Sequence, residues 1–342
     1  MSSFHRISLD AMGGDNGFPV VVAAAVEALQ EYQDIKLVLV GDEQTLTEEL
    51  KKHKNTNISR LSIHHASQTV AMDESPALAL RKKKDSSMRV AINLVKQGDV
   101  DAVVSAGNTG ALMATARFVL KMLPGIDRPA LCTAIPNSIT HTHMLDLGAN
   151  IDSSAEHLYQ FALMGSELVN AIDGIDAPRI GLLNIGEEEM KGNEQVKLAH
   201  DLIKRGNFNY QGFVEGNDIF SGKVDLIVCD GFVGNVALKT TEGLAKMLST
   251  ELKAEFTRNI FSKLAALISM PVLKTFMKRF DHRRYNGASL LGLQGIVVKS
   301  HGNVDALAYS KAIGIARKEV KAQLHLRIKS KLEAMMEEKT KD

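Results

Sequence analysis

Residues 101–122, DAVVSAGNTGALMATARFVLKM, decide the fold class of this chain. The apolar run at residues 102–104 predicts a short buried strand of a parallel sheet. Residues 105–110 interrupt that run with Ser, Gly, Asn and Thr, and the Ala-rich segment that follows has apolar side chains at helical spacing. A strand, a polar loop and a helix in this order form the repeating unit of α/β proteins.

The loop at residues 105–110 has the composition of an anion-binding turn. Its two glycines allow a sharp change of direction, and Asn108 or Thr109 can cap the helix that follows. Backbone N–H groups at the start of a helix attract anions. The loop, with Ser105, Gly107, Asn108 and Thr109, is therefore a candidate phosphate or oxyanion cradle, although an ordinary strand-to-helix turn has the same composition.

The same pattern recurs along the chain and predicts a parallel sheet whose strands are connected by helices. After the strand at residues 7–9 come Asp10, Gly13, Gly14 and Asp15, for which turn and cap roles fit equally well. Because the strands are predicted to be parallel, we expect their polar carboxyl ends to share one edge and to line an extended cleft. The later strand ends carry Asp146, Asn150, Asp230, Asn235, Lys299, His301 and Asn303.

Residues 184–194 form an unusually charged loop after the strand expected at residues 180–183. If this loop is already helical, Glu187 and Lys191 share a face. They are then either a solvated ion pair or part of a binding site.

His141 and His143 point to the same face of a predicted strand, which is a spacing that metal ligands use. The sequence nearby offers no evident third ligand. We therefore expect no metal site here.

Residues 256–280 predict an amphipathic helical hairpin that is broken at Pro271. Its apolar face either packs in the core or a dimer interface, or contacts a membrane or a hydrophobic ligand. The apolar stripe comprises Leu264, Leu267, Ile268, Val272, Leu273 and Phe276. The basic residues near its end are Lys278, Arg279, Arg283 and Arg284.

The bulk composition is that of an ordinary globular protein. With 342 residues the chain can bury a large core, and its net charge of +1 gives no reason to expect nucleic-acid binding. Cys132 and Cys229 lie far apart in apolar surroundings, as buried thiols do in a reducing compartment. The sequence shows neither a signal-peptide pattern nor an apolar run of about 20 residues, so we expect a cytoplasmic protein.

Missing motifs narrow the chemistry. No GxGxxG follows a strand, no GxxxxGK[ST] is present, and residues 287–291 fail the nucleophile-elbow pattern at its last glycine. The remaining means of catalysis are positioning of the substrates and electrostatic stabilisation of an anionic reaction centre. Backbone N–H groups, asparagines, Lys191, Lys299 and His301 would supply them.

Seven motifs together resemble the bacterial phosphate acyltransferases (PlsX), the acyl-carrier-protein:phosphate acyltransferases of phospholipid synthesis. The resemblance covers about residues 5–320. The motifs are DAMGGD (10–15), SAGNTGA (105–111), LDLGAN (145–150), NIGEEEMKGNE (184–194), EGND (215–218), DGFVGN (230–235) and KSHGNVDA (299–306).

The resemblance implies a three-layer α/β/α sandwich with a mostly parallel, Rossmann-like sheet, related to phosphotransacetylases and isocitrate dehydrogenase-like folds. Residues 1–342 would form one catalytic domain, with the hairpin at residues 256–285 as an insertion. It also implies a cytoplasmic homodimer in peripheral contact with the membrane. The reaction would convert acyl carrier protein (ACP) bearing an acyl group, together with orthophosphate, into acyl phosphate and free ACP. A glycerol-3-phosphate acyltransferase would use the product.

Residue roles follow from the resemblance. Lys191, His301 and Asn235 are the catalytic candidates, and Lys278, Arg279, Arg283 and Arg284 would contact ACP. No metal and no organic cofactor is expected, because phosphate itself is the nucleophile. The expected substrate-binding residues are Asp10, Gly13, Gly14, Asp15, Ser105, Gly107, Asn108, Thr109, Asp146, Asn150, Glu187, Asp230, Lys299 and Asn303. Two alternatives remain, an acetyl- or butyryl-CoA phosphate transferase and a non-catalytic membrane scaffold for lipid enzymes.

Overall fold

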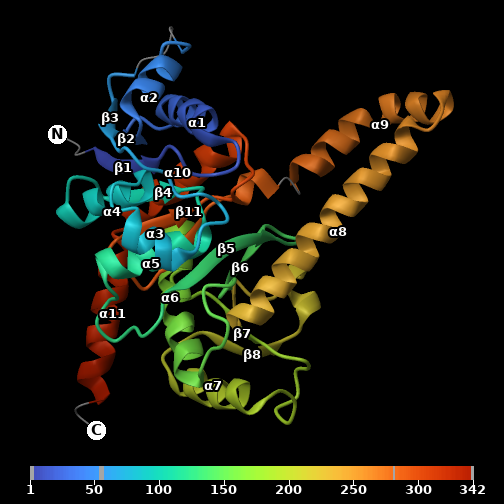
Figure 1. Ribbon diagram of the computed structural model, residues 1–342. Helices are drawn as coiled ribbons and strands as arrows, with labels where there is room; N and C mark the ends of the chain where they lie inside the picture. Colours follow the sequence, from blue (N-terminus) through green and yellow to red (C-terminus); the bar gives the residue numbers. More distant parts are fainter. Residues whose placement is uncertain (1–3, 54–57, 280–281, 340–342) are drawn as a thin grey trace.

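One mixed sheet runs through the computed structural model, which describes residues 4–53, 58–279 and 282–339 (Figure 1). Its strand order is β3-β2-β1-β4-β11-β10-β5-β6-β9-β7-β8. The strands are β1 (His5–Asp10), β2 (Ile35–Gly41), β3 (Leu61–His65), β4 (Ala102–Ser105), β5 (Ala130–Pro136), β6 (His141–Leu145), β7 (Ile180–Leu183), β8 (Tyr210–Val214), β9 (Leu226–Val228), β10 (Ala288–Leu291) and β11 (Ile296–Lys299).

Helices cover both faces of the sheet, which confirms the predicted α/β architecture. Apolar side chains of α1, α6, α7, α10 and α11 pack on one face, and those of α4 and α5 pack on the other. The helices are α1 (Gly17–Glu31), α2 (Glu43–Leu50), α3 (Pro76–Lys82), α4 (Ser87–Gln97), α5 (Thr109–Leu120), α6 (Ala155–Asp173), α7 (Glu194–Arg205), α8 (Gly231–Thr257), α9 (Ile260–Arg279), α10 (Ala306–Lys321) and α11 (Leu324–Lys339), with short 3₁₀ turns η1 (Gly216–Phe220) and η2 (His282–Tyr285).

Most neighbouring strands are parallel, as predicted, but they form two blocks of opposite direction. β3, β2, β1, β4 and β11 form one parallel block, and β6, β9, β7 and β8 form the other. Antiparallel pairing through β10 and β5 joins the blocks. The expectation that all polar strand ends share one edge is therefore wrong.

The reversal has a local cause between β5 and β6. Four residues separate these strands, and so short a connection permits only antiparallel pairing. The Asn137 side chain accepts hydrogen bonds from the backbone N–H groups of Ile139 and Thr140, at 2.8 and 2.6 Å, and so closes the turn.

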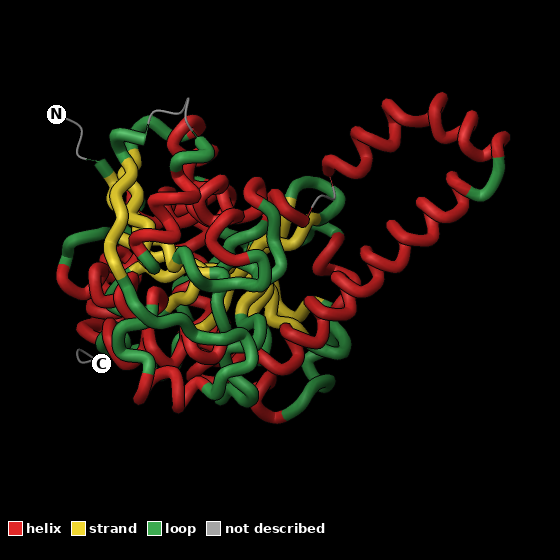
Figure 2. The backbone as a smooth tube through the Cα atoms, turned by 45° about the horizontal axis from the view of Figure 1, so that its top comes forward, coloured by secondary structure: helices red, strands yellow, loops and turns green. Residues whose placement is uncertain are grey.

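Helices α8 and α9 form a hairpin that projects from the body of the molecule (Figures 1 and 2). The predicted break at Pro271 is wrong, because α9 continues through this proline and the chain turns instead after α8 ends at Thr257. Pro271 is exposed, and its own carbonyl accepts a hydrogen bond from the Thr275 hydroxyl at 3.0 Å. No described helix has the length and hydropathy needed to cross a bilayer.

The predicted apolar stripe lies along α9. Leu267, Ile268 and Val272 are each more than two-thirds exposed in the single chain, whereas Leu273 is half-buried. Leu264 and Phe276 are also exposed. The hairpin therefore presents apolar surface that the described part of this chain leaves uncovered.

Candidate functional site

Three polar loops meet where β1, β4 and β11 end. Asp10, Ser105 and Lys299 are the last residues of these strands and are register partners across the sheet. The prediction that these three residues lie together is confirmed.

Asp10 is the centre of a buried hydrogen-bond network. One of its carboxylate oxygens accepts from the Ser87 hydroxyl and the other from the Ser105 hydroxyl, both at 2.6 Å. Ser105 Oγ in turn accepts from the Gly107 backbone N–H at 3.0 Å. Burial raises the pKa of Asp10, although these hydrogen bonds and the nearby charge of Lys299 oppose the increase. Asp10 thus connects the end of β1 with the start of α4 and the end of β4.

Glycine is required where the loops touch. A Cβ at Gly13 would lie 2.9 Å from the Gly107 backbone nitrogen, and Gly14 has a φ of +94° beside Ala106. The Asp15 backbone N–H donates to the Gly302 carbonyl at 2.9 Å. At these positions the loops pack backbone against backbone.

Lys299 brings a cation to the same loops. Its side chain is buried, and Nζ donates to the carbonyl of Ala106 at 3.3 Å and to that of Ser300. Burial lowers the pKa of Lys299 to about 8; Asp10 and Asp15 act in the opposite direction, and the charge of Lys239 on α8 lowers the pKa further. A buried ammonium of this kind is suited to an anionic ligand.

His301 and Asn303 lie beside this loop cluster and are exposed. The His301 backbone N–H donates to the Asn286 side chain at 3.0 Å, and His301 Nδ1 accepts from the Asn303 backbone at 3.3 Å. Asn303 Oδ1 also accepts from the Asn16 side chain at 3.2 Å. The His301 ring is thus tied to the loop that contains Lys299.

The predicted cap at the start of α5 is confirmed for Asn108. Its Oδ1 accepts from the Ala111 backbone N–H at 2.9 Å, while Nδ2 donates to the carbonyls of Met72 and Glu74 at 2.8 and 3.0 Å. Thr109 is the first residue of α5. The Asn108 side chain therefore has structural partners, and whether residues 105–110 bind an anion stays a prediction.

A second group of predicted residues surrounds Asp146, at the opposite edge of the sheet. The buried Asp146 carboxylate accepts four hydrogen bonds of 2.8–3.0 Å, from the backbones of Leu131, Ala149 and Asn150 and from the Asn150 side chain. Burial raises the pKa of Asp146 against these bonds. Asp146 organises the loop that follows β6.

Helix α8 begins against this loop. Asp230 caps the helix by accepting from the Phe232 backbone N–H at 2.9 Å, and a Cβ at Gly234 would collide with the Asp146 carbonyl. Asn235 is exposed and lies beside Gly148. Lys239 is one turn further along α8, and its charge acts on Lys299.

The charged loop after β7 is not helical, so the expected Glu187–Lys191 pair is wrong. Lys191 pairs with Glu188 at 2.9 Å, and Glu187 pairs with Lys223 at 3.1 Å. β7 lies five strand positions from β11, roughly 24 Å away, and in the block of opposite direction. Within one chain, Lys191 and His301 therefore do not meet in the predicted cleft.

The sequence did not indicate three residues around Lys299. Ser87 bonds to Asp10, Asn286 bonds to the His301 backbone, and Lys239 acts on Lys299 through its charge. Each comes from a distant segment, and a pattern of strand ends contains no signal for them.

Of the basic residues near the end of α9, Arg284 is exposed, and Arg283 pairs with Asp305 at 2.9 Å. The side chains of Lys278 and Arg279 lie outside the described part of the structure.

Comparisons with known proteins agree with one another. The family model described as "Fatty acid synthesis protein" matches residues 5–327. A protein of Methylococcus capsulatus named "Phosphate acyltransferase" is 61% identical over 94% of this chain and 95% of its own length. Another of that name, from Alkalilimnicola ehrlichii, is 57% identical over 98% of both chains.

Among solved structures, a phosphotransacetylase from Streptococcus pyogenes superposes with a TM-score of 0.63 at 18% identity, over 93% of this chain and 94% of that one. The EutD phosphotransacetylase of Staphylococcus aureus gives 0.61 at 16% identity, over 94% and 96%. These likenesses show the fold, which is that of phosphotransacetylases, as expected.

Proposed function

The chain belongs to the phosphate acyltransferase family, and on this premise we propose that it transfers a fatty acyl group from acyl-ACP to orthophosphate. The observation that carries the proposal is the 61% identity with a phosphate acyltransferase over 94% of the chain. The acyl phosphate would serve a glycerol-3-phosphate acyltransferase in phospholipid synthesis.

The reaction balances without a cofactor. A phosphate oxygen attacks the thioester carbonyl carbon, a C–O bond forms, and the tetrahedral oxyanion collapses with cleavage of the C–S bond. The thiolate of the carrier leaves and takes up the proton that hydrogen phosphate gives up. The enzyme must therefore hold a dianion, stabilise an oxyanion and accept a long acyl-carrying arm.

We assign phosphate binding to the loops after β1, β4 and β11. The buried ammonium of Lys299 and the closely packed loops at Gly13 and Gly107 support this assignment, because they bring positive charge to loops that lead into the N-termini of α1 and α5. His301, exposed beside Lys299, would face the thioester oxyanion. Asp10 would act by positioning Ser105 and its loop.

In this proposal Asn235, Asp146 and Asn150 lie along the part of the site that receives the acyl-carrying arm of ACP. Helix α8 leads from their loop towards Lys299, which gives an acyl-carrying arm a path along that helix. Lys191 and Glu187 are far from Lys299 in one chain, so their part in catalysis would require a second copy of the chain.

The proposal includes a homodimer and a peripheral membrane contact. The exposed apolar side chains of α8 and α9 support both, because such surface is normally covered. An acidic carrier protein would approach the basic residues near the end of α9, of which Arg284 is exposed.

The decisive experiment supplies the purified protein with orthophosphate and one of two donors, long-chain acyl-ACP or short-chain acyl-CoA, and measures acyl phosphate. We expect product from acyl-ACP. Product only from acetyl- or butyryl-CoA would favour the alternative transferase. Catalytic silence combined with vesicle binding would favour the scaffold alternative.

A further inference from the structure

A cluster of metal-ligating groups lies outside the site described above. His141 and His143, on β6, both direct Nε2 at Oδ2 of Asp173, at 2.9 and 2.8 Å. The sequence showed only the two histidines, whereas the fold adds Asp173 as a third donor from the end of α6.

The cluster is separate from the loops around Lys299. His143 lies on the same face of the sheet as Leu145, which packs in the cluster of α6 side chains. Asp10 points to the opposite face, where it bonds to Ser87 of α4. A ligand at the histidines would therefore not touch the proposed phosphate site.

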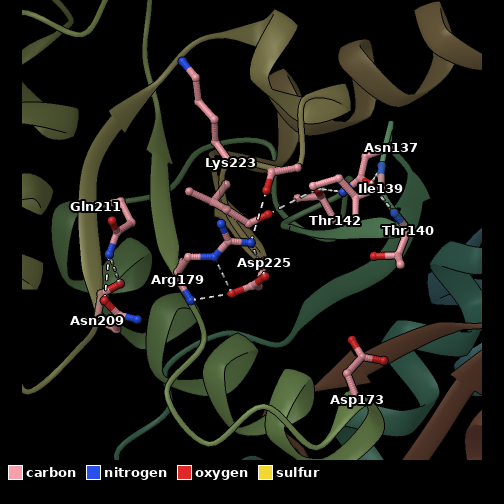
Figure 3. A network of polar contacts seen from close by, with 12 residues as sticks. Asn137, Ile139, Thr140, Thr142, Asp173, Arg179, Asn209, Gln211, Lys223 and Asp225 are labelled. Atoms are coloured by element: carbon pink, nitrogen blue, oxygen red, sulfur yellow. Dashed lines mark hydrogen bonds and ion pairs between the residues drawn. The ribbon is translucent and has the colours of Figure 1, made fainter.

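Asp173 needs a positive charge that its surroundings supply poorly. It is the last residue of a 19-residue helix, where the helix dipole disfavours an anion. The nearby Arg179 is committed to Asp225, at 2.8 Å (Figure 3). Among the described residues, the ion-pair partners of Asp173 are the two histidines.

One divalent cation would fit the arrangement of these three side chains. The rings of His141 and His143 are 5.0 Å apart between centroids and nearly perpendicular, and their Nε2 atoms converge beside the Asp173 carboxylate. Two imidazole nitrogens and one carboxylate oxygen are a ligand set typical of zinc and other first-row transition metals. The three donor atoms lie within 4.8 Å of one another, and neighbouring ligands of tetrahedral zinc are about 3.3 Å apart for bonds of about 2.0–2.1 Å.

We propose that His141, His143 and Asp173 bind a divalent transition metal of the zinc class, with a fourth position open to water. His143 and Asp173 are largely buried, and His141 is about one-quarter exposed, which leaves a route for the ion and for a water ligand. The metal would fasten the end of α6 to the start of β6. It would stabilise the fold and take no part in acyl transfer.

The test is a zinc titration of the full-length protein after chelation and dialysis, against a chromophoric competitor. We expect one zinc ion per chain and a higher melting temperature with zinc. His141→Gln and Asp173→Asn should each weaken binding about 100-fold or more and remove the thermal shift. His64→Gln, which changes an exposed histidine on β3, is the matched control and should bind as the wild type does.

Two variants at different ligands keep the test decisive if one of them folds poorly, which circular dichroism would reveal. A wild-type protein that takes up no stoichiometric zinc would overturn the proposal. So would a folded His141→Gln or Asp173→Asn protein that binds zinc as tightly as the wild type. In either event the cluster is an ion pair alone, and the acyl-transfer assay would be unaffected.

Discussion

At the scale of single residues, the proposed reaction depends most on Lys299. Lys299→Ala should lower turnover by about 10²–10³ and raise the KM for phosphate, because it removes the buried cation of the loop cluster. Steady-state kinetics with acyl-ACP and phosphate would measure both effects. Lys311→Ala, which removes a lysine that pairs with Glu31 at the surface, should change neither. Normal kinetics in a folded Lys299→Ala protein would exclude Lys299 from the mechanism.

The pH dependence of phosphate binding should report the same residue. Because the pKa of Lys299 is about 8, its positive charge is present at neutral pH and is lost as the pH rises through that value. The KM for phosphate should therefore increase above about pH 8. In Lys299→Arg this increase should disappear, since arginine stays charged. An unchanged alkaline limb in the arginine variant would assign it to another group.

A second buried ionisable residue, Glu319 on α10, affects stability. It accepts a hydrogen bond from Ser289 of β10, and burial raises its pKa to about 8 against that bond. The folded protein thus retains a proton that the unfolded chain loses near pH 4.5. The stability that Glu319 contributes is complete below about pH 4.5 and is lost as the pH rises to about 8.

Glu319→Gln should therefore stabilise the protein by about 1–3 kcal/mol near pH 8, because the amide needs no proton to be neutral. Urea denaturation at pH 5 and pH 8 would show the difference, which should widen with pH. Glu333→Gln changes a largely exposed glutamate and should have little effect at either pH. A Glu319→Gln protein less stable than the wild type at pH 8 would contradict this account.

Part of the site could be predicted at this scale. Asp10, Ser105 and Lys299 each end an apolar run, and parallel neighbours bring such ends together. Ser87, Asn286 and Glu319 could not be predicted, since their importance comes only from the partner that the fold brings to them.

At the scale of elements, the strand and helix periods predicted most of the structure. The strand expected at residues 102–104 is the core of β4, and that at residues 180–183 is β7. The helix break at Pro271 was wrong because the helix is exposed there, so the Leu267 carbonyl that loses its N–H donor at Pro271 can bond to water instead. Residues 184–193 form a loop, as predicted, and the Glu187–Lys191 pair is wrong because each of these residues pairs with another side chain.

The junction of α8 with the Asp146 loop gives a prediction at this scale. Gly234→Ala should destabilise the protein by about 3 kcal/mol or more, because a Cβ there would collide with backbone. Gly243→Ala, later in the same helix, meets nothing within 4 Å and should stabilise by about 0.5–1 kcal/mol. Thermal and urea denaturation of the two variants would compare them directly. Equal changes in the free energy of unfolding for the two variants would mean that the start of α8 does not pack closely against the Asp146 loop.

At the scale of the whole molecule, the sequence could not reveal the two opposed strand blocks. Each strand, loop and helix unit looks alike, and the reversal depends on one four-residue connection between β5 and β6. That reversal separates Lys191 from His301, although both residues end similar motifs. Local sequence patterns contain no information about which edge of the sheet a strand end will occupy.

The last prediction concerns the surface that the hairpin presents. Leu267 and Ile268 are exposed on α9, and each would contribute roughly 1.5–3 kcal/mol if an anionic bilayer covered it. Leu267→Glu with Ile268→Glu should abolish co-sedimentation with anionic vesicles and leave the fold, the oligomeric state and activity in solution unchanged. Leu198→Glu with Leu326→Glu changes exposed leucines on the body of the molecule and serves as the control for added charge. If a second copy covers these residues instead, the hairpin variant should dissociate or aggregate, and if neither covers them it should still sediment with vesicles. Either result would refute the membrane contact. That contact predicts that the hairpin variant loses vesicle binding while its oligomeric state stays unchanged.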